Sequence, residues 1–483
     1  MKWLLLVVLT VAGNACDFRD RGMDALKVGA EAERNGDYEK AINSYSRAIE
    51  SGELPKPDLV AAYNARGKVY AQRSRFEQAT ADFDAAIRLN PDDAFGYYNR
   101  GRITQDDDKA RQEFDNAIRL KPDHFDAFFE RGNIHNRAGD YDRAIADYTS
   151  AIRLNPNHTS AHISRGGLYH LKGDYDKAIA DYNVAIHSNP KDDIARIFRG
   201  GSYYEKQMFD RARADFDAAL GLNPRSSIAF SSRGMVKAAQ ADHDGAISDF
   251  DTALKLYPDD EDIAMILVER GRAYRRKGDL DRAIDDLTDA IRLNPDRGEA
   301  FRLRGITLRQ MNQHKRALGD FDAAVRDPNS NQNYYSRGLE HFYLGQFALS
   351  VKDLTRAVEL KPDHAFAAIW LFLAQSRSGQ NGARLLAEHA KRLEPTPWIR
   401  SIVDFLMGKL ASEAVLHTAK DADPKKDREQ HCEAYFYLGQ KALMRGNRSE
   451  AIRFFKLTLD TGVTNFVEYS GAESELTRLL QTK

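Results

Sequence analysis

The sequence predicts an all-α protein built as a solenoid of helical hairpins. Along its 483 residues a proline recurs at a constant step of 34 residues, at Pro122, Pro156, Pro190, Pro224 and Pro258. Glycine, alanine and aromatic residues recur in register with these prolines. A period of this length is typical of repeat architectures, in which each unit buries its apolar face against the next. The prior of about three compact domains that length alone would suggest therefore does not apply.

Each unit follows a small-large-small pattern. One unit contains Gly132, Ala144, Tyr148 and Ala151, and the next repeats them as Gly166, Ala178, Tyr182 and Ala185. Glycine and alanine suit positions where two antiparallel helices touch, aromatic rings fill the remaining space, and proline ends the second helix. Other units carry a ring in the same slot, at Phe83, Phe114, Phe216, Phe250 and Phe321. We predict that these rings form the core and hold no cofactor.

This pattern strongly resembles the tetratricopeptide repeat (TPR) family. The resemblance implies a right-handed TPR superhelix, an α-solenoid of about ten to twelve helix-turn-helix repeats. We call the first helix of each unit helix A and the second helix B. Ten tandem units are expected within 22–363, at 22–55, 60–93, 94–124, 125–158, 159–192, 193–226, 227–260, 264–297, 298–330 and 331–363. A degenerate helical repeat over 364–397, with Phe372 in the helix A glycine slot, and a C-terminal helical TPR-like module over 398–483 follow.

Three units depart from the regular spacing. The unit after Ala94 loses about one turn between Gly101 and Ala110, and extra residues precede the units that begin near Val60 and Ala264. Insertions in repeats usually lie in turns, where the backbone is already exposed. We therefore expect the acidic run 259–262 to be a solvated turn; a docking site for a basic partner is the alternative.

An arginine and an aspartate recur together through the repeats. The arginine precedes the helix A glycine, at Arg66, Arg100, Arg131, Arg165, Arg199, Arg233, Arg270, Arg304 and Arg337. The acid comes sixteen residues later in most units, at Asp82, Asp147, Asp181, Asp215, Asp249, Asp286, Asp320 and Asp353. Because helices A and B pack antiparallel, this spacing can bring the two side chains together, within one unit or across the next. We predict a repeated salt bridge that staples the solenoid; a functional row of arginines is the alternative.

Residues 1–15 predict a secretory signal peptide. Lys2 precedes a short apolar run and then small residues, which is the order typical of such peptides. The run is about half of the ~20 residues that a membrane-spanning helix needs. Cys16 is a candidate lipid anchor, because its setting resembles the lipobox of bacterial lipoproteins. Ordinary signal peptidase could instead cleave after the small residues. We expect an exported protein, periplasmic or tethered as a lipoprotein; a buried amphipathic first helix is the alternative.

The C-terminal segment carries a second resemblance. From Trp398 onward, residues 423–426, 432–439 and 462–469 resemble the end of NlpI-type periplasmic lipoproteins. That family implies a dimerising envelope adaptor, so a homodimer is expected, which holds peptidoglycan hydrolases and a periplasmic processing protease. The segment could equally serve to cap the apolar stack of repeats, since terminal units need a polar outer face.

The sequence contains no convincing catalytic, metal or nucleic-acid site. Its 71 basic and 72 acidic residues balance and form no basic block, which disfavours a phosphate backbone as partner. His158 and His162 are spaced as zinc ligands on one helix face but straddle a turn between units. Cys432 is best explained as a small residue at a helix start. We expect a chain that is not an enzyme and has no cofactor or metal.

Protein binding is the remaining class of function. In the TPR family, positions 2, 5, 9, 12 and 13 of helix A line the concave surface, which takes peptides or partner helices. On units three to six these positions give the partner-binding candidates Tyr98, Arg102, Phe129, Asn133, Asn136, Ile163, Ile197 and Tyr204. An apolar row flanked by amides and charges suits an extended or helical peptide. The position 5 side chains, Tyr98, Phe129, Ile163 and Ile197, could instead pack between units.

Two cellular roles follow from this expectation. The first is a scaffold or adaptor of the bacterial cell envelope that organises peptidoglycan hydrolases or a periplasmic protease. The alternative is a TPR subunit of an export or outer-membrane assembly complex. Both would use the same groove, and the sequence alone does not name the partner.

Overall fold

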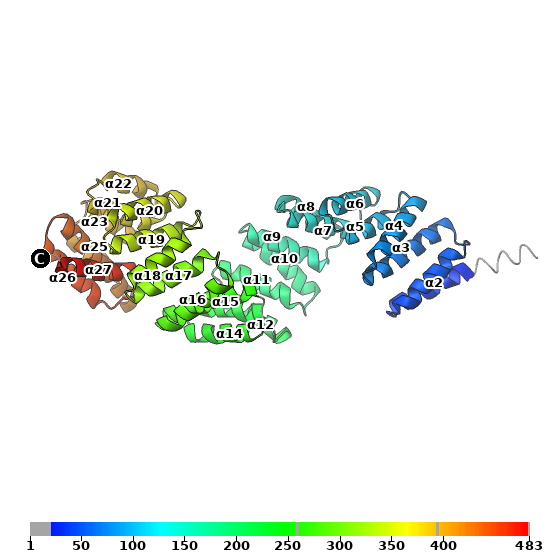
Figure 1. Ribbon diagram of the computed structural model, residues 1–483, viewed down its shortest axis with the longest axis horizontal. Helices are drawn as coiled ribbons and strands as arrows, with labels where there is room; N and C mark the ends of the chain where they lie inside the picture. The colour runs from blue at the N-terminus through cyan, green and yellow to red at the C-terminus, as the bar shows by residue number, and fades with distance from the viewer. Residues whose placement is uncertain (1–20, 257–259, 393–395, 482–483) are drawn as a thin grey trace, which may run out of the picture. The chain divides into compact units, whose positions relative to one another are not determined.

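A computed structural model describes residues 21–256, 260–392 and 396–481 of the chain. Within these ranges every regular element is a helix and no strand occurs. The all-α fold class is therefore confirmed. The chain divides into two compact units, residues 1–224 and 225–483, whose helices Figure 1 labels.

The first compact unit consists of consecutive helical hairpins. After a helical segment over 21–34, its helices are α2 (Tyr38–Glu50), α3 (Lys56–Gln72), α4 (Phe76–Leu89), α5 (Ala94–Ile103), α6 (Asp107–Leu120), α7 (Phe125–Arg137), α8 (Tyr141–Leu154), α9 (Thr159–Leu171), α10 (Tyr175–Ser188), α11 (Asp193–Glu205) and α12 (Phe209–Leu222). From α3 on, odd-numbered helices are helices A and even-numbered helices are helices B.

The second compact unit continues the hairpins and ends in a helical C-terminal part. Its helices are α13 (Ser227–Ala239), α14 (His243–Lys255), α15 (Asp260–Lys277), α16 (Leu280–Leu293), α17 (Gly298–Gln310), α18 (His314–Ala324), α19 (Asn331–Tyr343), α20 (Phe347–Leu360), α21 (Ala365–Arg377), α22 (Ala383–Arg392), α23 (Pro397–Leu406), α24 (Ser412–Thr418), α25 (Pro424–Met444), α26 (Arg448–Asp460) and α27 (Val467–Gln481).

A glycine in helix A lets the aromatic ring of helix B approach closely. A Cβ atom added to Gly132 would lie 2.8 Å from Cε1 of Tyr148, and one added to Gly200 would lie 2.7 Å from Cε1 of Phe216. Such distances are shorter than van der Waals contact, so any larger residue would push the two helices apart. The predicted aromatic slots are buried, at Phe83, Phe114, Tyr148, Tyr182, Phe216, Phe250 and Phe321.

The turn between helices A and B has its own local chemistry. Gly139 adopts a left-handed φ of 75°, which glycine reaches without steric cost and which ends helix α7. The side chain of the next residue, Asp140, accepts a hydrogen bond from the backbone N–H of Arg143 at 3.3 Å. Asp140 thereby caps the first turn of α8. The Gly139-Asp140-Tyr141 triplet seen in the sequence is therefore a helix stop followed by a helix start.

The predicted arginine–aspartate staple is present. In unit four, Nε and Nη2 of Arg131 donate to the two carboxylate oxygens of Asp147 at 2.8 and 2.7 Å. The remaining Nη1 donates to Asp115 of the preceding helix B at 2.7 Å. The same bidentate pairing joins Arg66–Asp82, Arg165–Asp181, Arg199–Asp215, Arg233–Asp249, Arg270–Asp286, Arg304–Asp320 and Arg337–Asp353. The staple thus links two neighbouring units as well as the helices of one.

Arg100 departs from this pattern because its unit lacks the acid at the usual spacing. Its Nη2 donates to both carboxylate oxygens of Glu113 at 2.9 Å, and its Nη1 donates to Asp84 at 2.6 Å. The lost turn in this unit is also visible, since helix A here is only Ala94–Ile103. The shortened helix moves the paired acid from the sixteenth to the thirteenth residue after the arginine.

The expectation of a solvated acidic turn at 259–262 is corrected for the part that the structure describes. Helix α15 begins at Asp260, so Glu261 and Asp262 lie in its first turn. Negative charges at a helix N-terminus are favourable, because the unsatisfied N–H groups there carry partial positive charge. The extra residues therefore lengthen helix A at its start.

The C-terminal part forms a closed core around α21. Trp370 of this helix is fully buried, and its ring lies 5.1 Å from those of Phe342 in α19 and Phe436 in α25. A helix that is apolar on all sides belongs inside a core. Helix α27 also packs on α19, where the hydroxyl of Tyr343 donates to the carbonyl oxygen of Val467 at 2.8 Å. The chain's own last helix therefore contacts the repeat that begins at Asn331.

The N-terminal expectations cannot be placed in this structure. Cys16 and the predicted signal peptide over 1–15 lie outside the described residues. Among the residues that are described, no helix is both long enough and apolar enough to cross a membrane.

Candidate functional site

Two of the predicted groove residues pack between units. The ring of Tyr98 lies 4.6 Å from that of His124, and the ring of Phe129 lies 4.8 Å from that of His158. Each histidine caps the next helix A, with its Nδ1 accepting a backbone N–H. The rings of Tyr335 and His364 lie at a similar distance of 4.7 Å, although His364 makes no capping hydrogen bond to α21. These half-buried rings contribute to repeat stacking, which was the alternative left open for position 5.

The isoleucines at position 5 offer little surface. Ile197 is only 5% exposed, and Ile163 is half-buried. Ile197 is therefore corrected from a groove residue to a core residue. The exposed apolar side chains of α11 are instead Ile194 and Phe198.

The polar candidates differ in how many of their polar groups already contact other residues of the chain. Asn133 donates to Glu130 at 3.1 Å and accepts from the hydroxyl of Tyr148 at 2.8 Å. Asn136 is half-buried, and the half-buried ring of Tyr204 lies 5.7 Å from that of Phe209. Arg102 is exposed and lies over the ring of Tyr98 at 5.8 Å. Arg102 is the one charged residue among the eight candidates, and its exposed side chain can reach a partner.

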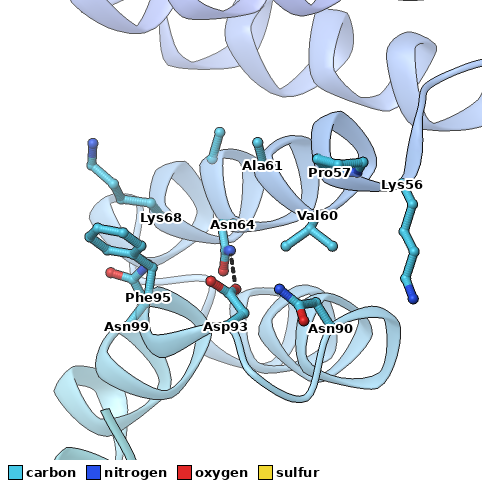
Figure 2. A pocket seen from close by; sticks show the side chains of 11 residues that line it. Lys56, Pro57, Val60, Ala61, Asn64, Lys68, Asn90, Asp93, Phe95 and Asn99 are labelled. Carbon is cyan, nitrogen blue, oxygen red and sulfur yellow. Dashed lines mark hydrogen bonds between the residues drawn. The ribbon is translucent and has the colours of Figure 1, made fainter. Parts of the chain in front are cut away.

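A pocket of about 660 Å³ lies between the helices A of units two and three (Figure 2). Helix α3 contributes one wall with Val60, Asn64 and Lys68, and the start of α5 contributes the other with Phe95 and Asn99. The ring of Phe95 is 51% exposed, although it also lies under the ammonium group of Lys121 at 4.7 Å. An exposed ring beside amides and an ammonium group is the mixture that peptide sites use.

Asn64 is the central polar group of this pocket. Its Nδ2 donates to Oδ2 of Asp93 at 2.6 Å, as Figure 2 shows, and Asp93 in turn caps α5. Its Oδ1 is shielded from solvent and has no hydrogen-bond partner among the described residues. A buried acceptor without a donor costs free energy. A ligand N–H group that reaches Asn64 would therefore be favoured.

A second hollow of about 250 Å³ shares Lys68 and Asn99 with this pocket and adds Arg102. The ammonium group of Lys68 is half exposed and contacts Glu33 at 2.8 Å. The two hollows together form what we call the α3–α5 groove, which is lined by Val60, Asn64, Lys68, Phe95, Asn99 and Arg102. It joins apolar surface to two positive charges: that of the exposed Arg102 and that of Lys68, which is also paired with Glu33.

Sequence reasoning missed most of this groove because it considered units three to six. Asn64 and Lys68 occupy positions 5 and 9 of unit two, the same positions that selected the other candidates. Extending the same rule by one unit would have found them. Phe95 stands at position 2 of unit three, so it too lay within the rule.

The residues considered for catalysis or metal binding have structural partners. His162 is buried between Asp181, at 2.8 Å, and the carbonyl oxygen of Pro156, while His158 caps α9. No group of three or more His, Cys, Asp or Glu side chains that could hold a metal occurs in the described ranges. Cys432 is corrected from a helix start to the buried interior of α25. Burial raises the pKa of its thiol to about 12, which disfavours the nucleophilic thiolate.

The C-terminal part contains buried acids that the sequence did not single out. The buried carboxylate of Glu468 accepts from the hydroxyl of Tyr437 at 2.8 Å, and Glu433 accepts from Nε1 of Trp398 at 2.5 Å. Burial first, and the nearby Glu468 second, raise the pKa of Glu433. These hydrogen bonds join α23, α25 and α27, so the acids organise the core of the C-terminal part.

Family comparisons agree with the helical hairpins. One model described as a tetratricopeptide repeat matches residues 29–94, 105–157, 137–193 and 268–332. Two further models with the same description match 225–296 and 332–364. Since these matches together cover more than half of the sequence, the chain belongs to the tetratricopeptide-repeat family. TPR proteins generally mediate protein–protein interactions, and the fold is typically a non-catalytic scaffold.

Several solved structures match parts of this chain. YrrB, a TPR protein with an unusual peptide-binding site, is 24% identical over 38% of this chain and 95% of that chain, with a TM-score of 0.31. MamA 41-end from Desulfovibrio magneticus RS-1 is 20% identical over 34% and 94%, with a TM-score of 0.33. The APC/C hetero-tetramer Cut9–Hcn1 matches 80% of this chain and 96% of that chain at 14% identity, with a TM-score of 0.46.

Proposed function

We propose that this protein is a non-catalytic adaptor of the bacterial cell envelope that holds partner peptides or helices in the α3–α5 groove. The observation that carries the proposal is the pocket in which an exposed Phe95 lies beside Asn64, whose buried Oδ1 lacks a donor. A partner backbone N–H would satisfy that oxygen if binding turns the Asn64 side chain toward the pocket. An apolar partner side chain would cover Phe95, and Lys68 or Arg102 would favour an acidic group at the end of the groove.

Replacing Phe95 with alanine should weaken partner binding by about 2 kcal/mol, or roughly thirtyfold in affinity. The ring supplies exposed apolar area to the partner and little to the core, so the melting temperature should change little. The measurement is affinity capture from an envelope extract, followed by titration of the captured partner against purified wild type and variant.

Tyr141→Ala is the matched control, because this ring is 39% exposed but starts a helix B. It should leave the affinity within about twofold of wild type. The α3–α5 groove would be rejected as the binding site if both variants bind equally well, or if Phe95→Ala lowers the melting temperature and the affinity together.

The envelope location rests on the N-terminal sequence. The positive charge, short apolar run and small residues before Cys16 support export, and Cys16 supports a lipid tether. The resemblance of the segment from Trp398 to NlpI-type lipoproteins supports cell-wall hydrolases or a periplasmic protease as the partners, and supports a homodimer. These partners are proposed on that resemblance alone.

Wild-type protein should fractionate with membranes, and Cys16→Ala should release it into the periplasmic fraction. The reason is that a lipid attached to the cysteine is the only tether proposed. Fractionation and immunoblotting measure this, with globomycin as an independent block of lipoprotein processing. A full-length protein in the cytosol would refute export, and a periplasmic wild type indifferent to both treatments would refute the lipid anchor.

A further inference from the structure

The helices A of units eight and nine gather arginines on one face. Helix α15 carries Arg272 and, three and four residues later, Arg275 and Arg276. Residues at these spacings from Arg272 lie on the same side of a helix. Arg302 lies on α17, which packs beside α15. We call these four residues the arginine cluster. In TPR numbering they occupy positions 9, 12, 13 and 5, which are positions of the helix A face.

The cluster carries more positive charge than its acidic neighbours neutralise. Arg272 donates to Glu299 at 2.6 Å and lies 3.3 Å from Glu269. Arg302 approaches the same Glu299 only to 3.8 Å. Glu299 therefore serves two arginines of the cluster, and Arg297 also lies 3.8 Å from it. Arg309 is nearby, but its charge is already compensated by the buried Glu340 at 2.8 Å.

Arg275 is the half-buried member of the cluster for which no acidic partner occurs among the described residues, while Arg276 is exposed. Its Nε is shielded from solvent and has no hydrogen-bond partner among the described residues. Burial and the repulsion of Arg276, Arg272, Arg302 and Arg309 lower its pKa to about 10. A half-buried guanidinium surrounded by other guanidinium groups is destabilising unless an anion reaches it.

The surroundings of the arginine cluster indicate what kind of anionic ligand can reach it. Arg302 is only 17% exposed, so a flat surface such as a bilayer cannot reach it. Met265 is 37% exposed and lies seven residues before Arg272, on the same face of α15. Lys425 at the start of α25 adds positive charge on this side, since Arg276 and Lys425 both lower the pKa of the partly buried His243 after burial itself. A narrow ligand with acidic groups and some apolar surface fits this setting.

We propose that the arginine cluster binds an acidic segment of a partner protein, with aspartate or glutamate side chains paired to Arg275 and Arg302. Carboxylates match the planar fork of arginine and can accept two hydrogen bonds from it. A nucleic acid is disfavoured because the chain has a net charge of −1 and 72 acidic residues, whereas binding to a phosphate backbone favours an excess of basic residues. The site lies in the second compact unit and is distinct from the α3–α5 groove.

The test is fluorescence anisotropy of the full-length protein with a labelled peptide of about twelve residues in which Glu and Ala alternate. Arg275→Gln and Arg302→Gln should each weaken binding by about tenfold or more. Arg292→Gln on α16 is the matched control, because this arginine is 71% exposed in its side chain, and it should stay within about twofold of wild type. Raising the salt concentration should weaken wild-type binding more than binding to Arg275→Gln.

The melting temperature of each variant and binding of two other probes, a Gln-containing peptide and an oligonucleotide, serve as controls. Arg275→Gln should leave the melting temperature unchanged or raised, because it removes a repelled charge. A peptide with Gln in place of Glu that binds equally well would overturn the proposal. So would an oligonucleotide that binds where the acidic peptide does not. If Lys68→Ala abolishes peptide binding while Arg275→Gln and Arg302→Gln do not, the peptide occupies the α3–α5 groove, which supports the proposed function and rejects this inference.

Discussion

Replacing Asp147 with alanine should lower the local free energy of unfolding of its repeat by about 3 kcal/mol. The carboxylate is nearly buried and accepts two hydrogen bonds from Arg131. Without it, a half-buried guanidinium keeps only its bond to Asp115 in the preceding helix B. Removing one partner of a buried pair costs more than the pair contributes, because the other charge stays desolvated.

Hydrogen exchange of the amides in α7 and α8 measures this effect repeat by repeat. Asp142→Ala is the matched control, since this aspartate lies on the same helix but is 86% exposed and pairs with Lys172 at the surface. It should change the free energy by less than about 0.5 kcal/mol. Equal effects of the two substitutions would show that the staple is an ordinary surface ion pair.

Two adjacent glycines of α11 should respond to alanine with opposite signs. A Cβ on Gly200 would meet Phe216 at 2.7 Å, whereas a Cβ on Gly201 would meet nothing within 4 Å. Gly200→Ala should therefore cost about 2 kcal/mol through overpacking. Gly201→Ala should stabilise the helix by about 0.5 to 1 kcal/mol, because alanine loses less backbone entropy than glycine.

Hydrogen exchange of α11 and α12, together with the melting temperature of each variant, measures both effects. The two substitutions add the same methyl group to neighbouring positions of one helix, so each serves as the control for the other. A similar change for both would mean that helix propensity, and not the contact with Phe216, determines the role of Gly200.

The repeat architecture could be predicted because its main interactions are local in sequence. The bond between Arg131 and Asp147 spans sixteen residues, and the contact between Gly132 and Tyr148 spans the same distance. Both recur in unit after unit, so the pattern is visible wherever the chain is compared with itself. The shortened helix at Ala94–Ile103 was also predictable, since a missing turn changes the spacing directly.

The candidate site could be predicted less well. Position 5 was expected to face a partner, but the ring of Phe129 packs on His158 and Ile197 is buried. The rotation of each helix A depends on the side chains of two neighbouring units, which no single repeat encodes. Asn64 and Lys68 occupy the same helix A positions, 5 and 9, in unit two. They differ from the candidates of the other units because they line the pocket beside Phe95.

The sequence by itself determined the helical hairpins, their close glycine contacts and the arginine–aspartate staple, because each arises between residues of one repeat or of the next. Only the tertiary structure decided which side chains are buried in the core and which remain available to a partner. It placed Trp370 among rings from α19 and α25 and brought Val467 to Tyr343 across 124 residues. It also left Nε of Arg275 buried without a hydrogen-bond partner among the described residues. Such outcomes depend on packing between segments far apart in the chain, where no sequence period links the contacting residues.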